Sequence, residues 1–197
     1  MVMASPDPVT PRRTAADWVE AAYARFHTEG IPGIRVEAVA RDLGSTKGSF
    51  YWHFADRAAL VTAVMERWEQ DETESFIVVA DRAPDPRTRL EVLFAAVARR
   101  RAPGEQRLYS DAVEQGVGDV VKRVTDRRVS YVSAALVELG VAPDEARRRG
   151  LTAVAFVLGL EQLTRGGAVE LVGTGDALQR TVLGILMPPG ETPADAG

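Results

Sequence analysis

The segment 36–54, VEAVARDLGSTKGSFYWHF, contains two short helical patterns separated by a tight turn. Its first half repeats apolar residues at spacings of three and four, which predicts a helix with one apolar face: Val36, Val39, Ala40 and Leu43. Gly44 should end that helix, because a residue without Cβ adopts the left-handed conformation at little cost. Thr46 (or Ser45) then offers a hydroxyl that can accept a backbone N–H and begin a second helix. Two helices joined in this way form a helix-turn-helix, a shape that fits the major groove of DNA.

The same region resembles a known family. Residues 46–54, TKGSFYWHF, followed by 56–60, DRAAL, are similar to the DNA-binding signature of the tetracycline-repressor (TetR) family. Residues 18–26, WVEAAYARF, and Gly30 are similar to the first helix of that family. The resemblance implies an all-α homodimer with an N-terminal three-helix helix-turn-helix domain and a C-terminal helical bundle, about nine helices in total.

The composition is that of an ordinary globular protein. Hydrophobic residues make up 46% and charged residues 26% of the 197 positions, which argues against wholesale disorder. Cysteine is absent, so disulfides, thiolate metal sites and cysteine nucleophiles are excluded. His27 and His53 lie too far apart to suggest a metal site, and no cofactor is expected. Because no stretch resembles a signal peptide or the roughly 20 apolar residues of a membrane span, we expect a cytoplasmic protein.

The net charge of −4 is distributed unevenly. Residues 12–57 hold seven Arg or Lys against six Asp or Glu, a net charge of +1, while the remainder carries −5. The direction is that of a DNA-binding segment, but its size does not decide the matter. The near-neutral segment is the one support for the alternative function, a helical small-molecule-binding or adaptor protein without DNA binding.

We expect the chain to divide into four parts. We expect a disordered arm at 1–11, a DNA-binding domain at 12–57, a ligand-binding and dimerisation domain at 58–187 and a disordered tail at 188–197. The first helix should span 15–28, and another should begin at Asp56 as its N-cap and continue to 72 or even 79 as a connecting rod. Further helices are expected at 86–101, 105–115, 119–139, 144–165 and 176–187.

The second helix of the motif supplies most of the candidate DNA-binding residues. Lys47 lies where recognition helices contact base edges, and Gly48 lets the backbone approach DNA closely. Tyr51 and His53 can donate to phosphate oxygens, and Trp52 can pack on a thymine methyl or a sugar. A solvated helix surface is the alternative for each. The full candidate set is Arg35, Thr46, Lys47, Gly48, Ser49, Tyr51, Trp52, His53 and Arg57.

Arginines and phenylalanines in and near this motif have further expected roles. The resemblance implies that Arg57 replaces a phosphate-binding lysine, and that Arg35 stands where the family commonly has Ser or Thr, so a hydroxyl cap is lost there. Phe50 and Phe54 are expected to face the core. Arg12 and Arg13 could contact phosphate, although a solvated flexible end is the favoured interpretation.

The C-terminal half supplies two further candidate sets. A helix over 151–163 is apolar nearly all round, so we infer that one side meets the core and the other a partner subunit, with a purely internal core as the alternative. The dimer-interface candidates are Leu151, Val154, Ala155, Leu158, Leu178, Val182, Ile185 and Leu186, with Gly159 and Gly184 allowing close approach. Candidate pocket residues are the aromatics Trp68, Phe94, Tyr109, Tyr131 and Phe156, although any one of them is more often plain core.

These patterns predict a DNA-binding transcriptional regulator rather than an enzyme. No metal-ligand cluster, Gly-rich phosphate loop or pair of nucleophile and base stands out in the sequence. A dimer would place two recognition helices in successive major grooves of a near-palindromic operator. A small-molecule effector bound within about 71–163 would shift the connecting rod and relieve repression.

Overall fold

The computed structural model describes residues 13–99, 108–165 and 175–187. The described secondary structure is entirely helical, as predicted: α1 (Ala15–Glu29), α2 (Val36–Asp42), α3 (Lys47–Phe50), α4 (Arg57–Glu69), α5 (Ser75–Ala80), α6 (Pro86–Arg99), α7 (Gly118–Glu138), α8 (Pro143–Arg165) and α9 (Gly175–Leu186). A 3-10 turn (Ile31–Gly33) joins α1 to α2, and a π-helix (Gln70–Glu74) joins α4 to α5. The expected arm and tail, and Arg12, lie outside the described residues.

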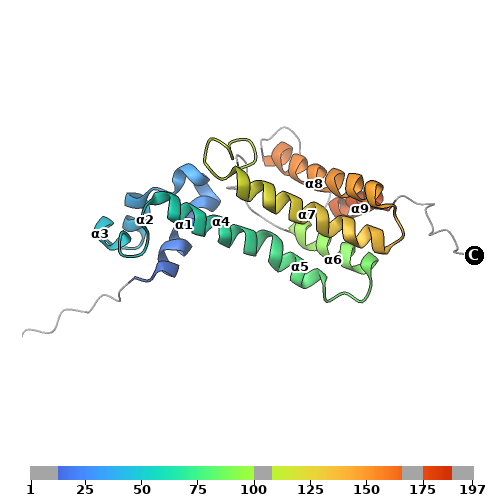
Figure 1. Ribbon diagram of the computed structural model, residues 1–197, viewed down its shortest axis with the longest axis horizontal. Helices are drawn as coiled ribbons and strands as arrows, with labels where there is room; N and C mark the ends of the chain where they lie inside the picture. The colour runs from blue at the N-terminus through green and yellow to red at the C-terminus, as the bar shows by residue number, and fades with distance from the viewer. Residues whose placement is uncertain (1–12, 100–107, 166–174, 188–197) are drawn as a thin grey trace, which may run out of the picture.

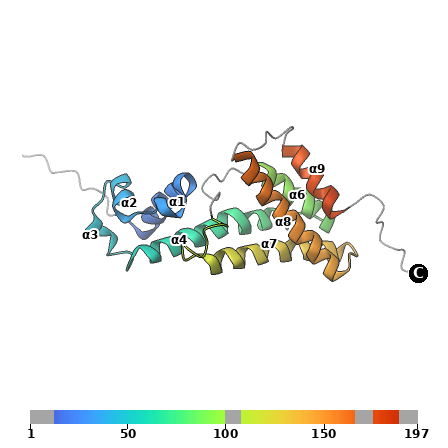
Figure 2. The same ribbon diagram turned by 90° about the horizontal axis from the view of Figure 1, so that it is seen from above.

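The molecule is elongated, with α1–α3 at one end and α6, α8 and α9 at the other (Figures 1 and 2). The two ends are joined by α4, the π-helix and α5, which follow one another without a break and are called the rod (residues 57–80). Helix α7 runs beside the rod. The helix-turn-helix is therefore presented at the tip of the molecule, away from the bundle.

The rod begins where the sequence predicts. Asp56 is its N-cap, and the Asp56 Oδ1 atom accepts a hydrogen bond of 2.8 Å from the Ala59 backbone N–H. The rod ends at Ala80, close to the longer of the two predicted ends. Within it, the π-helix replaces the expected α-helical turn. Such insertions widen one turn of a helix and are frequent at functional sites.

One predicted helix is wrong over its described part. Residues 108–115 of the expected 105–115 helix form successive turns rather than a helix. Only Leu108 and Ala112 of this stretch are buried, so it lacks a continuous apolar face. Gly116 then reverses the chain with a φ of +72°, and Val117 N–H bonds back to the Ala112 carbonyl at 2.8 Å. Two buried side chains and a glycine turn therefore hold this segment against the core.

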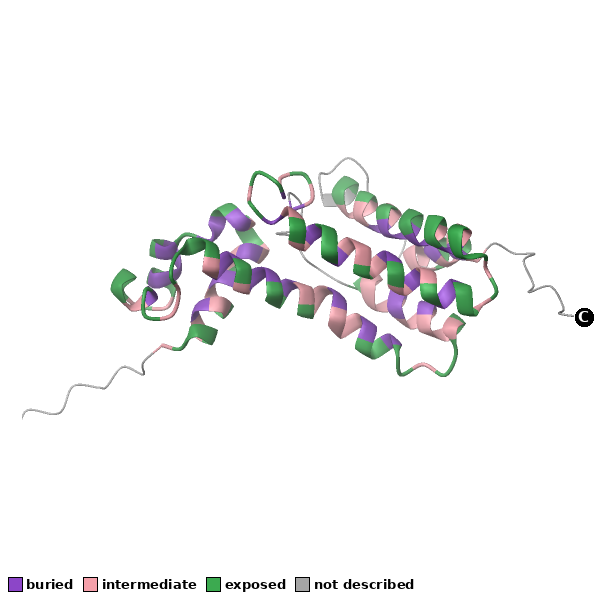
Figure 3. Ribbon diagram, viewed as in Figure 1, coloured by how far each residue is buried: buried purple, intermediate pink, exposed green. Residues whose placement is uncertain are grey.

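The apolar core has two parts, visible as buried stretches in Figure 3. The first gathers α1–α4, the turns at 108–117 and the start of α7 around the fully buried Trp18, Phe26, Phe50 and Trp68. The second gathers α5–α9 around Leu90, Leu136, Val182 and Leu186. Because the first cluster includes α7 residues, packing continues across the expected boundary at 57/58. That division of domains stays a prediction.

Candidate nucleic-acid interface and apolar pocket

The turn of the helix-turn-helix is built by Gly44. Its φ is +59°, and a Cβ added there would meet no atom within 4 Å, so backbone conformation and not space requires glycine. Ser45 N–H bonds to the Ala40 carbonyl at 2.8 Å, and Gly44 N–H bonds to the Arg41 carbonyl at 3.1 Å. This pair of bonds is the Schellman motif that ends a helix on a left-handed residue. The predicted helix stop is confirmed.

The second helix of the motif, α3, is a single turn. Thr46 is its N-cap, with Oγ1 accepting from the Ser49 N–H at 3.2 Å. Phe50 is fully buried, and its ring lies 5.4 Å from that of Trp18 and 5.6 Å from that of Phe54. Edge-to-face and stacked contacts at these distances are favourable. One buried ring thus holds α3 against α1, and its remaining side chains turn outward.

The outward side of α3 and the turn after it carry most of the predicted set. The side chains of Trp52 and Tyr51 are 80% and 56% exposed, unusual for large apolar rings. Lys47 and Gly48 are exposed beside them, whereas Ser49 and His53 are half-buried. Arg35 is exposed at the N-cap of α2, where it makes no side-chain cap bond, as its loss of a hydroxyl predicts.

The recognition-helix lysine already has a partner. Lys47 Nζ lies 2.6 Å from Glu37 Oε1 of α2, and both side chains are more than half exposed. The hydrogen bond between them raises the pKa of Lys47 and lowers the pKa of Glu37. Glu37 was not a candidate from sequence, although an acid in the first turn of the first helix of the motif is a usable signal. A phosphate or base contact by Lys47 must compete with this carboxylate.

Two arginines make backbone contacts that the sequence did not predict. Arg57 Nε donates to the Ile34 carbonyl at 2.6 Å, and its Nη2 donates to the Ile31 carbonyl at 2.8 Å. Arg57 therefore fixes the start of the rod to the loop between α1 and α2. Arg13 Nε donates to the Leu43 carbonyl at 3.0 Å, where a cation at the C-terminus of α2 is favourable.

Further ion pairs link α1 to α2 and to the rod. Arg25 of α1 contacts both Asp42 of α2 and Glu29 of α1, and the hydrogen bond from Arg25 lowers the pKa of Asp42. Arg67 of the rod bonds to Asp71 at 2.8 Å and lies 3.5 Å from Glu20 of α1. The surface that carries Tyr51 and Trp52 is thus positioned by α1, α2 and the rod together.

A pocket lies at the other end of the rod. It is lined by residues of the rod, α6, α7 and α8, most of them apolar, and its cavity volume is about 70 Å³. Its polar groups are Glu72 and Thr73 of the π-helix together with Arg128 and Tyr131 of α7. Tyr131 Oη donates to Asp81 Oδ1 at 2.7 Å, and burial followed by this bond raises the pKa of the phenol.

The five predicted pocket aromatics separate into three groups. Phe94 and Tyr131 line the pocket. Trp68 is fully buried in the first core cluster, and Phe156 packs against the second. Tyr109 contacts Arg128 through its hydroxyl at 2.8 Å without lining the pocket itself. Arg128 and Thr73 were not among the predicted residues. Arg128 lies five residues from Arg123 and one from Arg127, and neither spacing brings side chains together on a helix, so the sequence carries no signal for it.

The predicted interface residues also separate. Val182 and Leu186 are fully buried within the subunit's own core, and Val154 lines the pocket, so these three need no partner. Leu178 and Ile185 are half-buried, and Leu158 is a half-buried pocket residue. Leu151 and Ala155 are exposed on α8, and Leu163 and Gly159 are exposed on the same helix.

Across 13–99, 108–165 and 175–187, no cluster of three or more His, Asp or Glu side chains could hold a metal ion. No helix in the described part of the chain is both long enough and apolar enough to cross a membrane.

Known proteins resemble the chain at two levels. Residues 19–64 match the family described as bacterial regulatory proteins, tetR family. The transcriptional regulator TtgR of Pseudomonas putida is 31% identical over 74 residues, which are 38% of this chain and 34% of that protein. The chain therefore matches about a third of the length of this curated relative.

Solved structures extend the likeness to the whole fold. A TetR-family transcriptional regulator from Streptomyces coelicolor has a TM-score of 0.74 at 17% identity, covering 90% of both chains. Reduced NemR of E. coli has a TM-score of 0.73 at 14% identity, covering 92% of this chain and all of the other. At these identities the structures show a shared fold alone. The chain thus carries a tetR-family segment at residues 19–64, within a fold that it shares with solved TetR-family regulators.

Proposed function

We propose that this protein is a DNA-binding transcriptional regulator that reads an operator with α3, works as a homodimer and is controlled by a small molecule in the bundle pocket. The observation that carries the proposal is the surface around α3. Its capped single turn presents Lys47, Tyr51 and Trp52 outward at the tip of the molecule, remote from the bundle (Figure 1). Exposed aromatic rings beside a cation are suited to DNA contact. Tyr51 also packs edge-on against the buried Phe50 ring, with 5.1 Å between the ring centres, and still leaves more than half of its surface exposed.

The role proposed for each side chain depends on whether contacts within the subunit already engage it. Lys47 can exchange Glu37 for a base edge or a phosphate, and Tyr51 can donate its hydroxyl to a phosphate oxygen. Trp52 has the exposed area to pack on a thymine methyl or sugar. Thr46 and Arg57 are engaged with backbone atoms, so their part is to shape the surface. Arg35, Gly48, Ser49 and His53 remain candidates at its margin.

The dimer is supported by glycines that the subunit does not need. A Cβ added to Gly159 of α8 or Gly184 of α9 would meet no atom within 4 Å. Glycine inside a helix costs about 0.5–1 kcal/mol relative to alanine, so an open position gains nothing from it. Close approach of a second subunit would explain why glycine is present at both positions. Leu151, Ala155 and Leu163 continue the exposed stripe of α8 on which Gly159 lies.

The dimer is tested by light scattering. Gly159→Leu should convert a dimer to a folded monomer, because the larger side chain has room within the subunit and would clash only with a partner. Val113→Leu, at a position that is 88% exposed outside this stripe, is the matched control and should remain dimeric. A dimer that survives Gly159→Leu would remove α8 from the interface.

Ligand control is supported by the place of the pocket. Glu72 and Thr73 both line it and belong to the π-helix of the rod, so a bound molecule would touch the rod directly. Any change in the π-helix alters how the bundle holds the α1–α3 unit. Ligand and DNA would then favour different arrangements and oppose each other reciprocally. This supports effector-relieved repression as the mode of action.

DNA binding is tested by fluorescence anisotropy with fragments of the gene's own upstream region. Lys47→Ala and Tyr51→Phe should each weaken binding, and retention should fall as salt rises. Lys122→Ala is the matched control, because Lys122 is also exposed and paired, with Asp126 at 2.6 Å, but lies on α7. Unchanged affinity in both α3 variants would exclude α3, and ligand binding without any DNA retention would favour the carrier alternative.

A further inference from the structure

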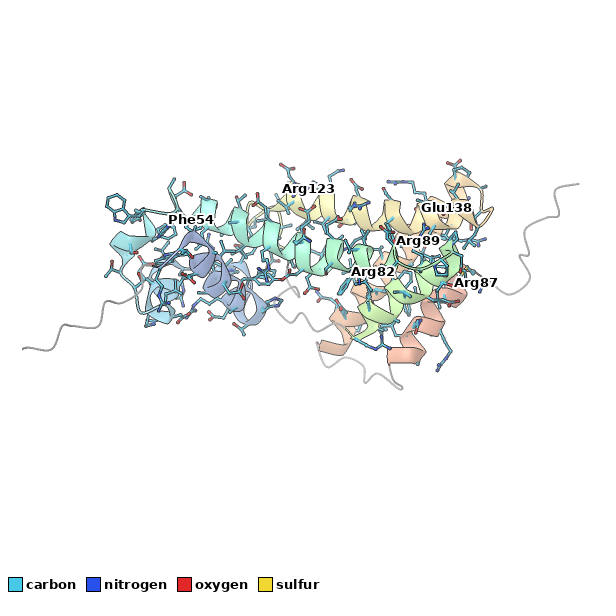
Figure 4. All side chains as sticks on the ribbon, turned by 90° about the horizontal axis from the view of Figure 1, so that it is seen from below. Phe54, Arg82, Arg87, Arg89, Arg123 and Glu138 are labelled. Atoms are coloured by element: carbon cyan, nitrogen blue, oxygen red, sulfur yellow. The ribbon has the colours of Figure 1, made fainter. Side chains whose placement is uncertain are left out.

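Three arginines of α7 contact the rod around its π-helix, and one differs from the other two. Arg123 Nη2 lies 2.6 Å from Glu69 Oε2, and Arg127 Nε lies 3.0 Å from Glu74 Oε1 (Arg123 is labelled in Figure 4). Each of these two cations has a carboxylate partner. Arg128 has none among the described residues.

The hydrogen-bond partners of Arg128 are all neutral. Its Nε donates to Thr73 Oγ1 at 2.8 Å, its Nη1 to Tyr109 Oη at 2.8 Å and its Nη2 to the Glu72 carbonyl at 3.0 Å. The guanidinium also lies 5.3 Å from the centre of the Trp68 ring. Hydroxyls, a carbonyl and an aromatic face solvate a cation without neutralising it. A half-buried guanidinium in this state attracts an anion more strongly than one that is already paired.

Arg128 also lines the pocket. Most of the other lining residues are apolar, with Phe76, Leu93, Phe94 and Val157 among them. The other charged side chain of the lining is Glu72. The hydrogen bond between these two residues goes to the backbone carbonyl of Glu72 and not to its carboxylate, so it does not neutralise Arg128. The structure therefore favours an anion at Arg128. Because Glu72 is negatively charged, the test must include a cation as a competitor.

We infer that the pocket binds a compact carboxylic acid, with its carboxylate on Arg128 and its apolar body against Phe94 and its neighbours. The inference rests on the ligand-binding part of the proposed function and names the class of ligand. Carboxylate and guanidinium match in shape and can form two parallel hydrogen bonds, which a neutral amide cannot reproduce. Two of the bonds that Arg128 now makes go to the π-helix, to Thr73 and to the Glu72 carbonyl, so ligand and rod draw on the same guanidinium.

The inference is tested by calorimetry on the whole protein without DNA. The probes have similar shapes and differ in charge: benzoate is an anion, benzamide is neutral and benzylamine is a cation. Benzoate should bind at least about tenfold more tightly than benzamide, as expected for charged hydrogen bonds. Arg128→Gln should remove that preference, and Arg128→Lys should keep part of it. Arg127→Gln is the matched control, one residue away and outside the pocket lining, and should leave the preference intact.

Melting temperatures confirm that each variant is folded, and Arg128→Lys carries the test if Arg128→Gln does not fold. Equal binding of benzoate and benzamide, a preference for benzoate that survives Arg128→Gln, or no binding of any probe would overturn the inference. Preferred binding of benzylamine would overturn it as well and assign the pocket to cations through Glu72. If benzoate binds through Arg128 but leaves DNA affinity unchanged, the inference stands and ligand control of DNA binding fails.

Discussion

Replacing Arg57 distinguishes a role in DNA binding from a role in stabilising the fold. As a phosphate ligand, Arg57 would contribute to DNA affinity and little to folding. In the structure it instead donates hydrogen bonds of 2.6 and 2.8 Å to the carbonyls of Ile34 and Ile31. Bonds from a charged donor contribute about 1.5–3 kcal/mol each at best, and the exposed position of Arg57 reduces them. We therefore expect Arg57→Ala to lower the free energy of unfolding by about 2 kcal/mol, or about 4–8 °C in melting temperature for a chain of this size.

The conservative variant sharpens the test. Lysine keeps the charge but can satisfy at most one of the two carbonyls with good geometry, so Arg57→Lys should also lower the melting temperature, by less than Arg57→Ala. The assay is thermal unfolding followed by circular dichroism, together with DNA anisotropy over a series of salt concentrations. The slope of log affinity against log salt should not change in either variant. The reasoning is refuted if both melt like the wild type while Arg57→Ala flattens that slope by about one, the signature of a lost phosphate contact.

Three further changes test the surface and its scaffold. Glu37→Gln should tighten DNA binding by about two- to fivefold, because Lys47 no longer exchanges a carboxylate for DNA; unchanged anisotropy titrations would contradict the competition. Thr46→Ala should destabilise α3 by about 1 kcal/mol through loss of its N-cap, and weaker DNA binding with a normal dimer is the expected readout. Gly150→Ala should destabilise the chain by about 1–3 kcal/mol, since its Cβ would lie 2.8 Å from Ser133 Oγ where α8 packs on α7; a melting temperature equal to or above that of the wild type would show that the helices can separate to admit it.

Features set by chemistry within a few residues could be predicted from the sequence. The left-handed Gly44, the Thr46 and Asp56 caps and the inward Phe50 are all present. Each depends on a property of the residue itself, such as a missing Cβ, a short acceptor side chain or an apolar ring at helical spacing. The all-α fold follows from the same local periodicity.

Features set by contacts between distant segments could not be predicted. Arg57 meets carbonyls more than twenty residues away, and Lys47 meets a carboxylate on the other helix of its motif. Sequence shows that such side chains are charged but not which neighbours the fold brings to them. The same holds for the aromatics. Spacing marks Trp68 and Phe94 equally as apolar, and both are buried core residues; only the packing of distant elements places Phe94, and not Trp68, in the wall of the pocket.

The size of the coupling between pocket and rod can be bounded from one side chain. Thr73 is the one buried polar side chain within the described residues, at 3% exposure, and its hydroxyl accepts a hydrogen bond from Arg128. A ligand that draws Arg128 away leaves that oxygen without its donor unless the π-helix rearranges. An unsatisfied buried polar group costs about 1–3 kcal/mol, which is the usual size of an allosteric coupling free energy. Under the proposed ligand control, redirecting this one arginine would change the relative stability of two rod arrangements by roughly five- to 150-fold, the usual range of an allosteric coupling.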